Sequence, residues 1–364
     1  MAAFGPLLRS YRLRAGLGLR TFAGLIGQRA STVSAIESVR RAPWRHDELL
    51  QRVAEVLGLA ESSDSWNELC LLARRDADRP IATNSPGQGE TLQWWWSTDG
   101  APPLDQQELA EMASFLGATI ATGPSAEESN IELPPLTELA IEWRVRRLLG
   151  RRNSLVAAGP VDVESALERQ ANVRLEIVPG LVPRFSVQAC VVKSPDAVTI
   201  YVDRIVGDSR PLASYRQVLA ECYAPAALWG DDALADQAAC WFERLQASDA
   251  WPRALRDCRR FALAMLLPAN PVLAGAEIAY RELVEQQGWV EPEVGARVVR
   301  NRVAEQFAVP PAEVHRRMVA WPCHLYGRIA QALAAQEPTL PPTDWLVDDD
   351  APRQQTLFDL RAAP

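Results

Sequence analysis

Hydrophobic residues in the first part of the chain recur at the spacing of short amphipathic helices. Leu7, Leu8 and Tyr11 form one apolar stripe, and Val33 and Ile36 lie one helical turn apart further along. Glycines interrupt the pattern between and after these stripes, as expected for helices joined by tight turns. The pattern therefore predicts a run of short helices at the start of the chain.

From residue 134 onward, the hydrophobic pattern alternates between helical and strand-like segments. Three runs are rich in β-branched residues and are separated by Pro, Gly or Asp, at 173–178, 185–193 and 197–203. Amphipathic helices are predicted before and after these strands. The expected fold class is mainly α with a small β-sheet: an all-α N-terminal domain, then an α+β domain and a helical C-terminal segment.

Composition predicts four parts along the chain. Residues 1–75 form the helical domain, and residues 76–133, rich in Pro, Gly, Ser and Thr, form a linker with one amphipathic helix. The linker contains the tryptophan cluster Trp94–Trp96, whose side chains cannot all point one way and are expected to pack against another part of the protein. The α+β domain is expected over 134–335, followed by a Pro-rich, acidic and disordered tail at 336–364.

Charge is distributed unevenly along the chain. The 364 residues carry a net charge of −8, yet the first sixty hold nine arginines and four acids, a local charge of +5. This segment alone is therefore expected to have an anionic partner.

Cysteine spacing and hydropathy predict a cytoplasmic protein without membrane attachment. The six cysteines have no paired or finger-like spacing, which is typical of reduced thiols. The sequence has no signal-peptide pattern and no apolar run of the roughly 18–20 residues that would cross a bilayer.

One segment of the basic region carries a more specific pattern. Within residues 17–41, a small Ala23 and a turn at Gly27 precede the run STVSAIE at 31–37. This pattern resembles the helix-turn-helix of Xre/λ-repressor-type regulators, a fold that places its second helix in the major groove. The resemblance implies that the protein binds double-stranded DNA. A small helical domain used for protein contacts or dimerisation is the alternative.

The resemblance also implies which residues face DNA. These are Arg29, Ala30, Ser31, Thr32, Ser34, Ala35, Arg40 and Arg41, the last two near the phosphate backbone. The two alanines can contact only a thymine methyl, so base readout is expected to rest on Arg29, the serines and DNA shape. Because one module of this size covers little DNA, a homodimer is expected.

The second half of the chain resembles the ImmA/IrrE-type metallopeptidase domain, which is often fused behind an Xre-type module. The matching pieces are a PVD segment at 160–162, the three strands, Arg216, and the segments FALAMLLP at 261–268 and VAEQFAV at 303–309. In that family the active-site helix reads LAHELGH, whose two histidines bind zinc while the glutamate polarises water.

The family's metal ligands are replaced in this chain. Aligned on Arg216 without a gap, Glu221 and Pro225 stand at the histidine positions, Cys222 stands at the general base, and Asp257 is a weak counterpart of the third ligand. A register shifted by one residue places alanines there instead. The domain is therefore expected to be a pseudo-peptidase without metal, cofactor or catalytic residues, and to bind a small-molecule or peptide effector or to mediate dimerisation.

The tail contains a short motif. Gln354, Leu357 and Phe358 lie in the run QQTLF, which resembles the peptide by which bacterial DNA-repair and replication proteins bind the sliding clamp. The predicted function is a sequence-specific, DNA-binding transcriptional regulator with a non-catalytic C-terminal domain. Two alternatives remain: an active peptidase that cleaves a repressor partner, and a DNA-repair or phage-defence interaction protein recruited through its tail.

Overall fold

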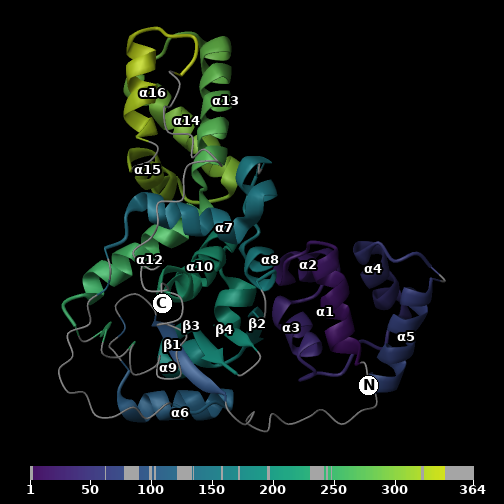
Figure 1. Cartoon of the computed structure of the whole chain (residues 1–364). Helices are drawn as coiled ribbons and strands as arrows, with labels where there is room; N and C mark the ends of the chain where they lie inside the picture. The colour runs from purple at the N-terminus through teal and green to yellow at the C-terminus, as the bar shows by residue number, and fades with distance from the viewer. Residues whose placement is uncertain are drawn as a thin grey trace, which may run out of the picture. The chain divides into compact units, whose positions relative to one another are not determined.

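The protein is mainly helical with a small four-stranded sheet, as the sequence predicts (Figure 1). The computed structural model describes residues 3–61, 63–77, 90–97, 101, 104–120, 133, 135–156, 159–170, 173–194, 197–229, 242, 245–246, 248–320 and 324–340. Contacts divide the chain into two units. The main unit comprises Met1–Pro268 and Phe307–Pro310, and the C-terminal unit comprises Ala269–Gln306 and Pro311–Pro364.

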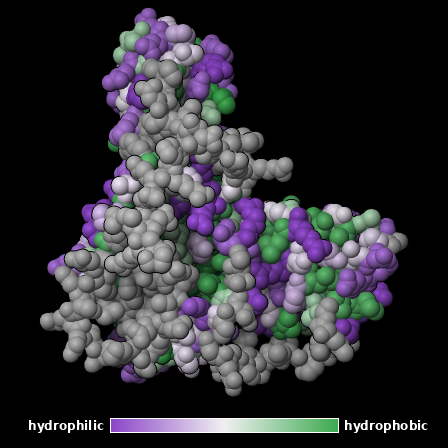
Figure 2. Space-filling model, viewed as in Figure 1, coloured by the Kyte–Doolittle hydropathy of each residue, from purple (hydrophilic) through white to green (hydrophobic). Residues whose placement is uncertain are grey.

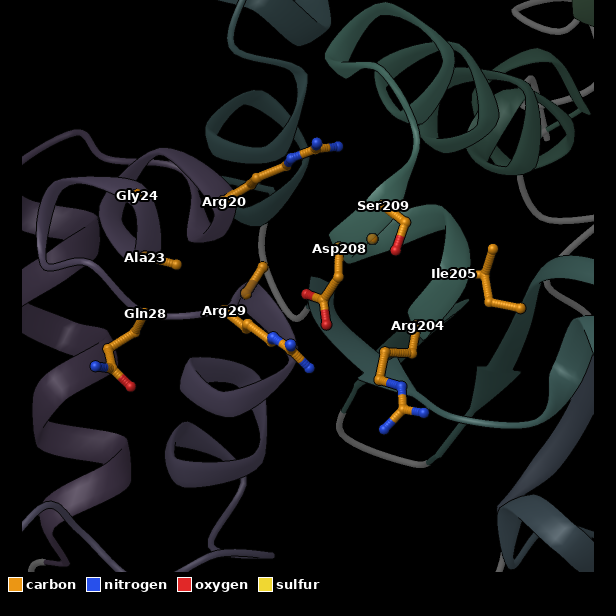
Figure 3. Close-up of a pocket in the computed structure, with 11 residues that line it drawn as sticks. Arg20, Ala23, Gly24, Gln28, Arg29, Arg204, Ile205, Asp208 and Ser209 are labelled. Carbon is orange, nitrogen blue, oxygen red and sulfur yellow. The ribbon is translucent and has the colours of Figure 1, made fainter.

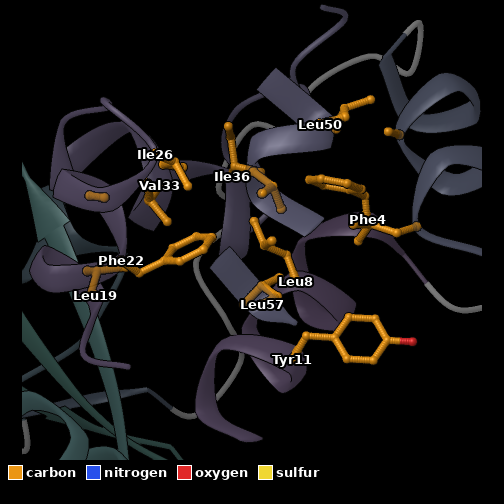
Figure 4. Close-up of a cluster of buried hydrophobic side chains, with 14 of the residues drawn as sticks. Phe4, Leu8, Tyr11, Leu19, Phe22, Ile26, Val33, Ile36, Leu50 and Leu57 are labelled. Carbon is orange, nitrogen blue, oxygen red and sulfur yellow. The ribbon is translucent and has the colours of Figure 1, made fainter. Parts of the chain in front are cut away.

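The main unit begins with a helical module, residues 3–77. Its helices are α1 (Phe4–Arg14), α2 (Leu19–Leu25), α3 (Ala30–Glu37), α4 (Asp47–Leu57) and α5 (Asp64–Ala77). Apolar side chains from all five helices form a buried core, and Figure 4 shows some of them, among them Phe22, Val33 and Leu50. Gly27 lies in the turn between α2 and α3 with φ of 69°, a left-handed conformation that glycine adopts without strain.

The rest of the main unit, residues 90–268, is an α+β body built on one sheet. Its strands are β1 (Thr91–Ser97), β2 (Val173–Val178), β3 (Val187–Lys193) and β4 (Val198–Asp203), in the order β1-β3-β4-β2. Strands β2 and β4 are parallel and the other two pairs are antiparallel. The sheet therefore has β1 at one edge and β2 at the other.

Helices surround the sheet of the body. Helix α10 (Leu212–Trp229) packs on the sheet, and α7 (Glu138–Val156) and α12 (Trp251–Leu266) pack on α10. The smaller helical elements are α6 (Gln106–Leu116), α8 (Val163–Glu168), α9 (Leu181–Phe185) and a single π-helical turn, η1 (Ile205–Ser209). The turn η1 directly follows β4, and its Gly207 lies against Ile177 of the edge strand β2.

Strand β1 departs from the linker expected over 76–133. Its three tryptophans pair with β3, Trp95 opposite Cys190, and their side chains are 0–7% exposed. The strand is buried on both faces and therefore has no polar–apolar alternation, which is the signal that identifies a half-buried strand. The amphipathic helix expected after it is α6.

The C-terminal unit consists of α13 (Ala269–Gln287), most of α14 (Pro292–Phe307), α15 (Pro311–Val319) and α16 (Leu325–Ala334). The domain expected over 134–335 is therefore divided at Pro268. Among the described residues, no single helix is long and apolar enough to cross a membrane; only α12 and α13 taken together have the length and composition.

Candidate functional site

The helix that the resemblance assigns to DNA recognition, α3, packs against the body. It lies along β2, the edge strand of the sheet (Figure 1), and it also contacts η1. The backbone N–H of Ile177 in β2 donates to the hydroxyl of Ser34 at 2.8 Å, and Ser34 is only 2% exposed. The module thus satisfies an N–H at the edge of the sheet that no neighbouring strand pairs.

The first turn of α3 binds a carboxylate of the body. Ser31 donates its backbone N–H to Asp208 at 3.0 Å and its hydroxyl to the other carboxylate oxygen at 2.6 Å. Asp208 lies on η1, so a negative charge is held at the N-terminus of the helix, where free N–H groups and the helix dipole favour an anion. These are the donors that a recognition helix offers to a DNA phosphate.

A buried ion-pair cluster also joins the module to the body. Arg12, fully buried in α1, donates to both oxygens of Glu37 at 2.8 Å and to Glu168 of the body at 2.7 and 3.1 Å. Arg9 adds a second cation at 3.2 Å from Glu168. With two cations and two carboxylates, the cluster is neutral, which is the condition under which buried charges are tolerated.

Two further carboxylates of the body meet the start of α2. The N–H of Gly18 donates to Asp162 at 3.1 Å, and the N–H of Arg20 donates to Glu164, with 2.9 Å to its nearer oxygen. A Cβ atom on Gly18 would lie 2.5 Å from Glu164 and 2.6 Å from Asp162, so a larger residue here would displace both carboxyl groups. Burial raises the pKa of Glu164 to about 8, even though its carboxylate accepts a hydrogen bond from Tyr215.

The junction is complementary in charge. Arginines of the module form ion pairs with Glu168 and Glu176 of the body, and backbone N–H groups and Ser31 of the module bind three further carboxyl groups. The five carboxylates are Asp162, Glu164, Glu168, Glu176 and Asp208. Hydrophilic side chains gather where the module meets the body in the space-filling view (Figure 2). Sequence reasoning missed all five carboxylates because they are spread over α8 and its N-cap, β2 and η1, with no spacing that marks them as a group.

The residues predicted to face DNA fall into two groups. Ser31 and Ser34 bind the body, Ala30 is 4% exposed, and Arg40 forms an ion pair with Glu176 at 2.9 Å.

The second group does not contact these carboxylates. Arg29 and Arg41 are exposed, Ala35 and Thr32 are half-buried, and Arg41 donates to the hydroxyl of Thr32 at 3.4 Å. In this conformation a DNA duplex could reach the arginines but could not reach Ser31 or Ser34.

The positions that replace the family's zinc ligands lie inside α10 and α12 and are engaged in other contacts. The carbonyl of Cys222 accepts the indole N–H of Trp94 from β1 at 2.7 Å, and burial raises the pKa of the Cys222 thiol. Glu221 accepts the side-chain N–H of Gln217 at 2.9 Å. Asp257, whose pKa is raised by burial, lies 3.6 Å from Arg260.

These residues do not fit a zinc site. Pro225 has no ligand atom in its side chain and lies buried within α10. Within the described part of the chain, no group of three His, Cys, Asp or Glu side chains could hold a metal ion.

The predicted clamp-binding residues Gln354, Leu357 and Phe358 lie outside the described residues. Comparison with protein-family models, with curated protein sequences and with solved structures found no match. The likenesses to Xre-type regulators and to ImmA/IrrE-type domains therefore stay predictions from the sequence.

Proposed function

We propose that the protein is a sequence-specific DNA-binding regulator whose acidic body holds the module in a closed conformation. In this state the body binds Ser31 and Ser34 of α3, the helix that would contact DNA. The module must therefore leave the body before it can read DNA. The observation that carries the proposal is the pair of hydrogen bonds from Ser31 to Asp208. A carboxylate here has the charge and the acceptor geometry that a DNA phosphate would present.

Charge complementarity supports the same reading. The module is basic and the remainder of the chain is acidic, so the body attracts the face that would attract DNA. DNA and body then compete for α3. The apparent affinity for DNA equals the affinity of the free module reduced by the fraction of molecules that are open.

In this proposal the body acts by holding the module and performs no catalysis. The residues at the family's metal positions support that role, since Cys222 is bound to Trp94 through its carbonyl and Pro225 offers no ligand. An active peptidase would need ligands from elsewhere in the chain. Zinc content of the purified protein, measured by mass spectrometry, separates the two readings.

The test is DNA binding by the full chain carrying substitutions that open the junction. Asp208→Ala removes the carboxylate that binds α3, and Gly18→Ala places a methyl group against Glu164 and Asp162. Each change removes or displaces charge-assisted hydrogen bonds, so each is expected to tighten binding to the protein's own upstream duplex by about tenfold. Glu111→Ala on α6, which removes an exposed carboxylate outside the junction, is the matched control.

Fluorescence anisotropy at two salt concentrations, with a scrambled duplex as competitor, measures the effect. Specific binding should survive higher salt, whereas binding to phosphates alone should fall steeply. If neither open variant binds any duplex, the DNA-binding proposal is wrong. If the open variants bind no more tightly than the wild type, the closed conformation has no regulatory role.

A second candidate function is favoured by one observation. The cluster of Arg12, Glu37 and Glu168 is buried, and the side chain of Ile177 belongs to the module's own core. A junction of this kind also suits a module that never separates and serves only as part of an interaction protein. Hydrogen exchange of the Ser31 and Ile177 amides decides: exchange only by global unfolding would favour this candidate.

A further inference from the structure

A cavity of about 510 Å³ lies beside Asp208, between the α2–α3 segment of the module and η1 of the body (Figure 3). Its polar lining comes from both parts. The module contributes Arg20, Gln28 and Arg29, and the body contributes Arg204, Asp208 and Ser209. In the close-up, the side chains of Arg29 and Arg204 extend into the space on one side of Asp208, and Arg20 lies on the other side (Figure 3).

The cavity has an excess of positive charge. Three guanidinium groups line it, against the single carboxylate of Asp208, which already accepts two hydrogen bonds from Ser31. As far as the described residues extend, no carboxylate lies within ion-pair distance of Arg29 or Arg204. Both side chains therefore retain their full capacity to bind an anion.

Arg20 lines the cavity, and part of its guanidinium is already bound within the protein. Its Nη2 donates to the carbonyl of Arg210 at 2.7 Å, and its guanidinium lies over the ring of Tyr215, 5.3 Å from the centroid. Its Nη1 is buried and has no hydrogen-bond partner among the described residues. Because this nitrogen is closed off from solvent, Arg20 adds positive charge at the wall of the cavity, and the direct contacts to a ligand would come from Arg29 and Arg204.

We infer that this cavity binds a phosphorylated small molecule. Arginine forks match the oxygens of a phosphate in charge and geometry, and Arg29 and Arg204 extend into the same space from separate parts of the chain. The volume falls within the range of about 300–1,000 Å³ that is typical of small-molecule sites and is larger than a lone phosphate needs. A nucleoside diphosphate has both the charge and the size.

Because the lining residues come from both the module and the body, a bound ligand should favour one conformation over the other. This step rests on the proposed function. A ligand held by Arg29 of the module and Arg204 of the body can make both contacts only in the closed conformation. It therefore stabilises the closed state and opposes DNA binding. By linkage, DNA lowers the affinity for the ligand by the same factor.

The first experiment is calorimetric titration of the full chain with ADP, inorganic pyrophosphate and adenosine. ADP and pyrophosphate are expected to bind, and adenosine, which lacks phosphate, is not. Arg204→Ala and Arg29→Ala are each expected to weaken ADP binding by about tenfold or more, because each removes a charge-assisted contact. Arg169→Ala, which removes an exposed arginine of the body outside the cavity, should change it less than about twofold.

The outcomes separate the cavity from the proposed function. Absence of ADP and pyrophosphate binding at millimolar concentration overturns the cavity assignment, as does equal binding by the wild type and Arg204→Ala. If ADP binds as expected but no duplex binds to any variant, the cavity stands and the DNA-binding proposal fails. If ADP binds as expected and the open variants bind DNA, ADP should weaken DNA binding by the wild type and leave DNA binding by Arg204→Ala nearly unchanged.

Discussion

Glu164 is a buried carboxyl group at the junction whose pKa lies far from its ordinary value. Burial raises its pKa to about 8, from an ordinary value of 4.5. The groups around it oppose one another: Tyr215 and the N–H of Arg20 stabilise the charged form, and the carboxylates of Asp162 and Glu168 disfavour it. If separation of the module exposes Glu164 to water, the pKa of its carboxyl group falls toward the ordinary value, and near neutral pH opening then releases a proton.

This linkage predicts pH-dependent DNA binding. Between the open-state pKa near 4.5 and the closed-state pKa of about 8, the closed state holds more protons, so its advantage falls as pH rises. DNA affinity of the wild type is expected to rise several-fold from about pH 6 to about pH 8.5. Glu164→Gln, a neutral side chain of the same size, should flatten this dependence in the same anisotropy measurement.

The comparison between the two proteins isolates the carboxyl group. Every other titratable group of the chain is present in both proteins and cancels in the difference. An identical pH profile for the wild type and Glu164→Gln would contradict a role for this proton in opening.

At the scale of elements, β1 fixes α10 within the body. Trp94 is fully buried and donates its indole N–H to the carbonyl of Cys222, close to Pro225, which lacks the N–H that an interior helical residue donates. The strand thus contributes both apolar area and a hydrogen bond to the middle of the helix. The tryptophan cluster is a structural link between sheet and helix.

Trp94→Phe is expected to lower the free energy of unfolding by about 2 kcal/mol. The substitution removes the hydrogen bond to Cys222 and leaves a small cavity where the larger indole ring packed. Urea denaturation followed by circular dichroism measures the loss. Trp143→Phe on α7 makes the same chemical change at a side chain that is 43% exposed and should cost little. Equal stability of the two variants would contradict the link described here.

The elements that the sequence predicts are those with a clear period. The three strands of the body and the helices of the module lie close to the expected residues, because β-branched runs and i, i+3 stripes mark them locally. Strand β1 was missed because it is buried on both faces and carries no alternation. Its neighbours along the chain, rich in turn-forming residues, favoured a linker.

At the scale of the whole molecule, the sequence indicates a basic module and an acidic remainder, but it does not indicate that the module packs against the body. The junction depends on the direction of individual side chains, such as Asp208 on η1 and Glu176 on β2, which only the folded sheet brings to one edge. The same holds for the cavity, since Arg29 and Arg204 are 175 positions apart in the chain. Charge totals suggest attraction, and the fold determines where it acts.

The position of α3 along β2 has a consequence for assembly. When the module leaves, β2 becomes a bare strand edge with the N–H of Ile177 unpaired, and a bare edge readily pairs with another. Two open chains joined through β2 would form a twofold-symmetric dimer that carries two modules. Gly18→Ala is therefore expected to show a concentration-dependent dimer in sedimentation velocity that the wild type lacks, and a monomer at every concentration would contradict this. Release of the recognition helix and assembly into the form with two DNA readers would then be a single event.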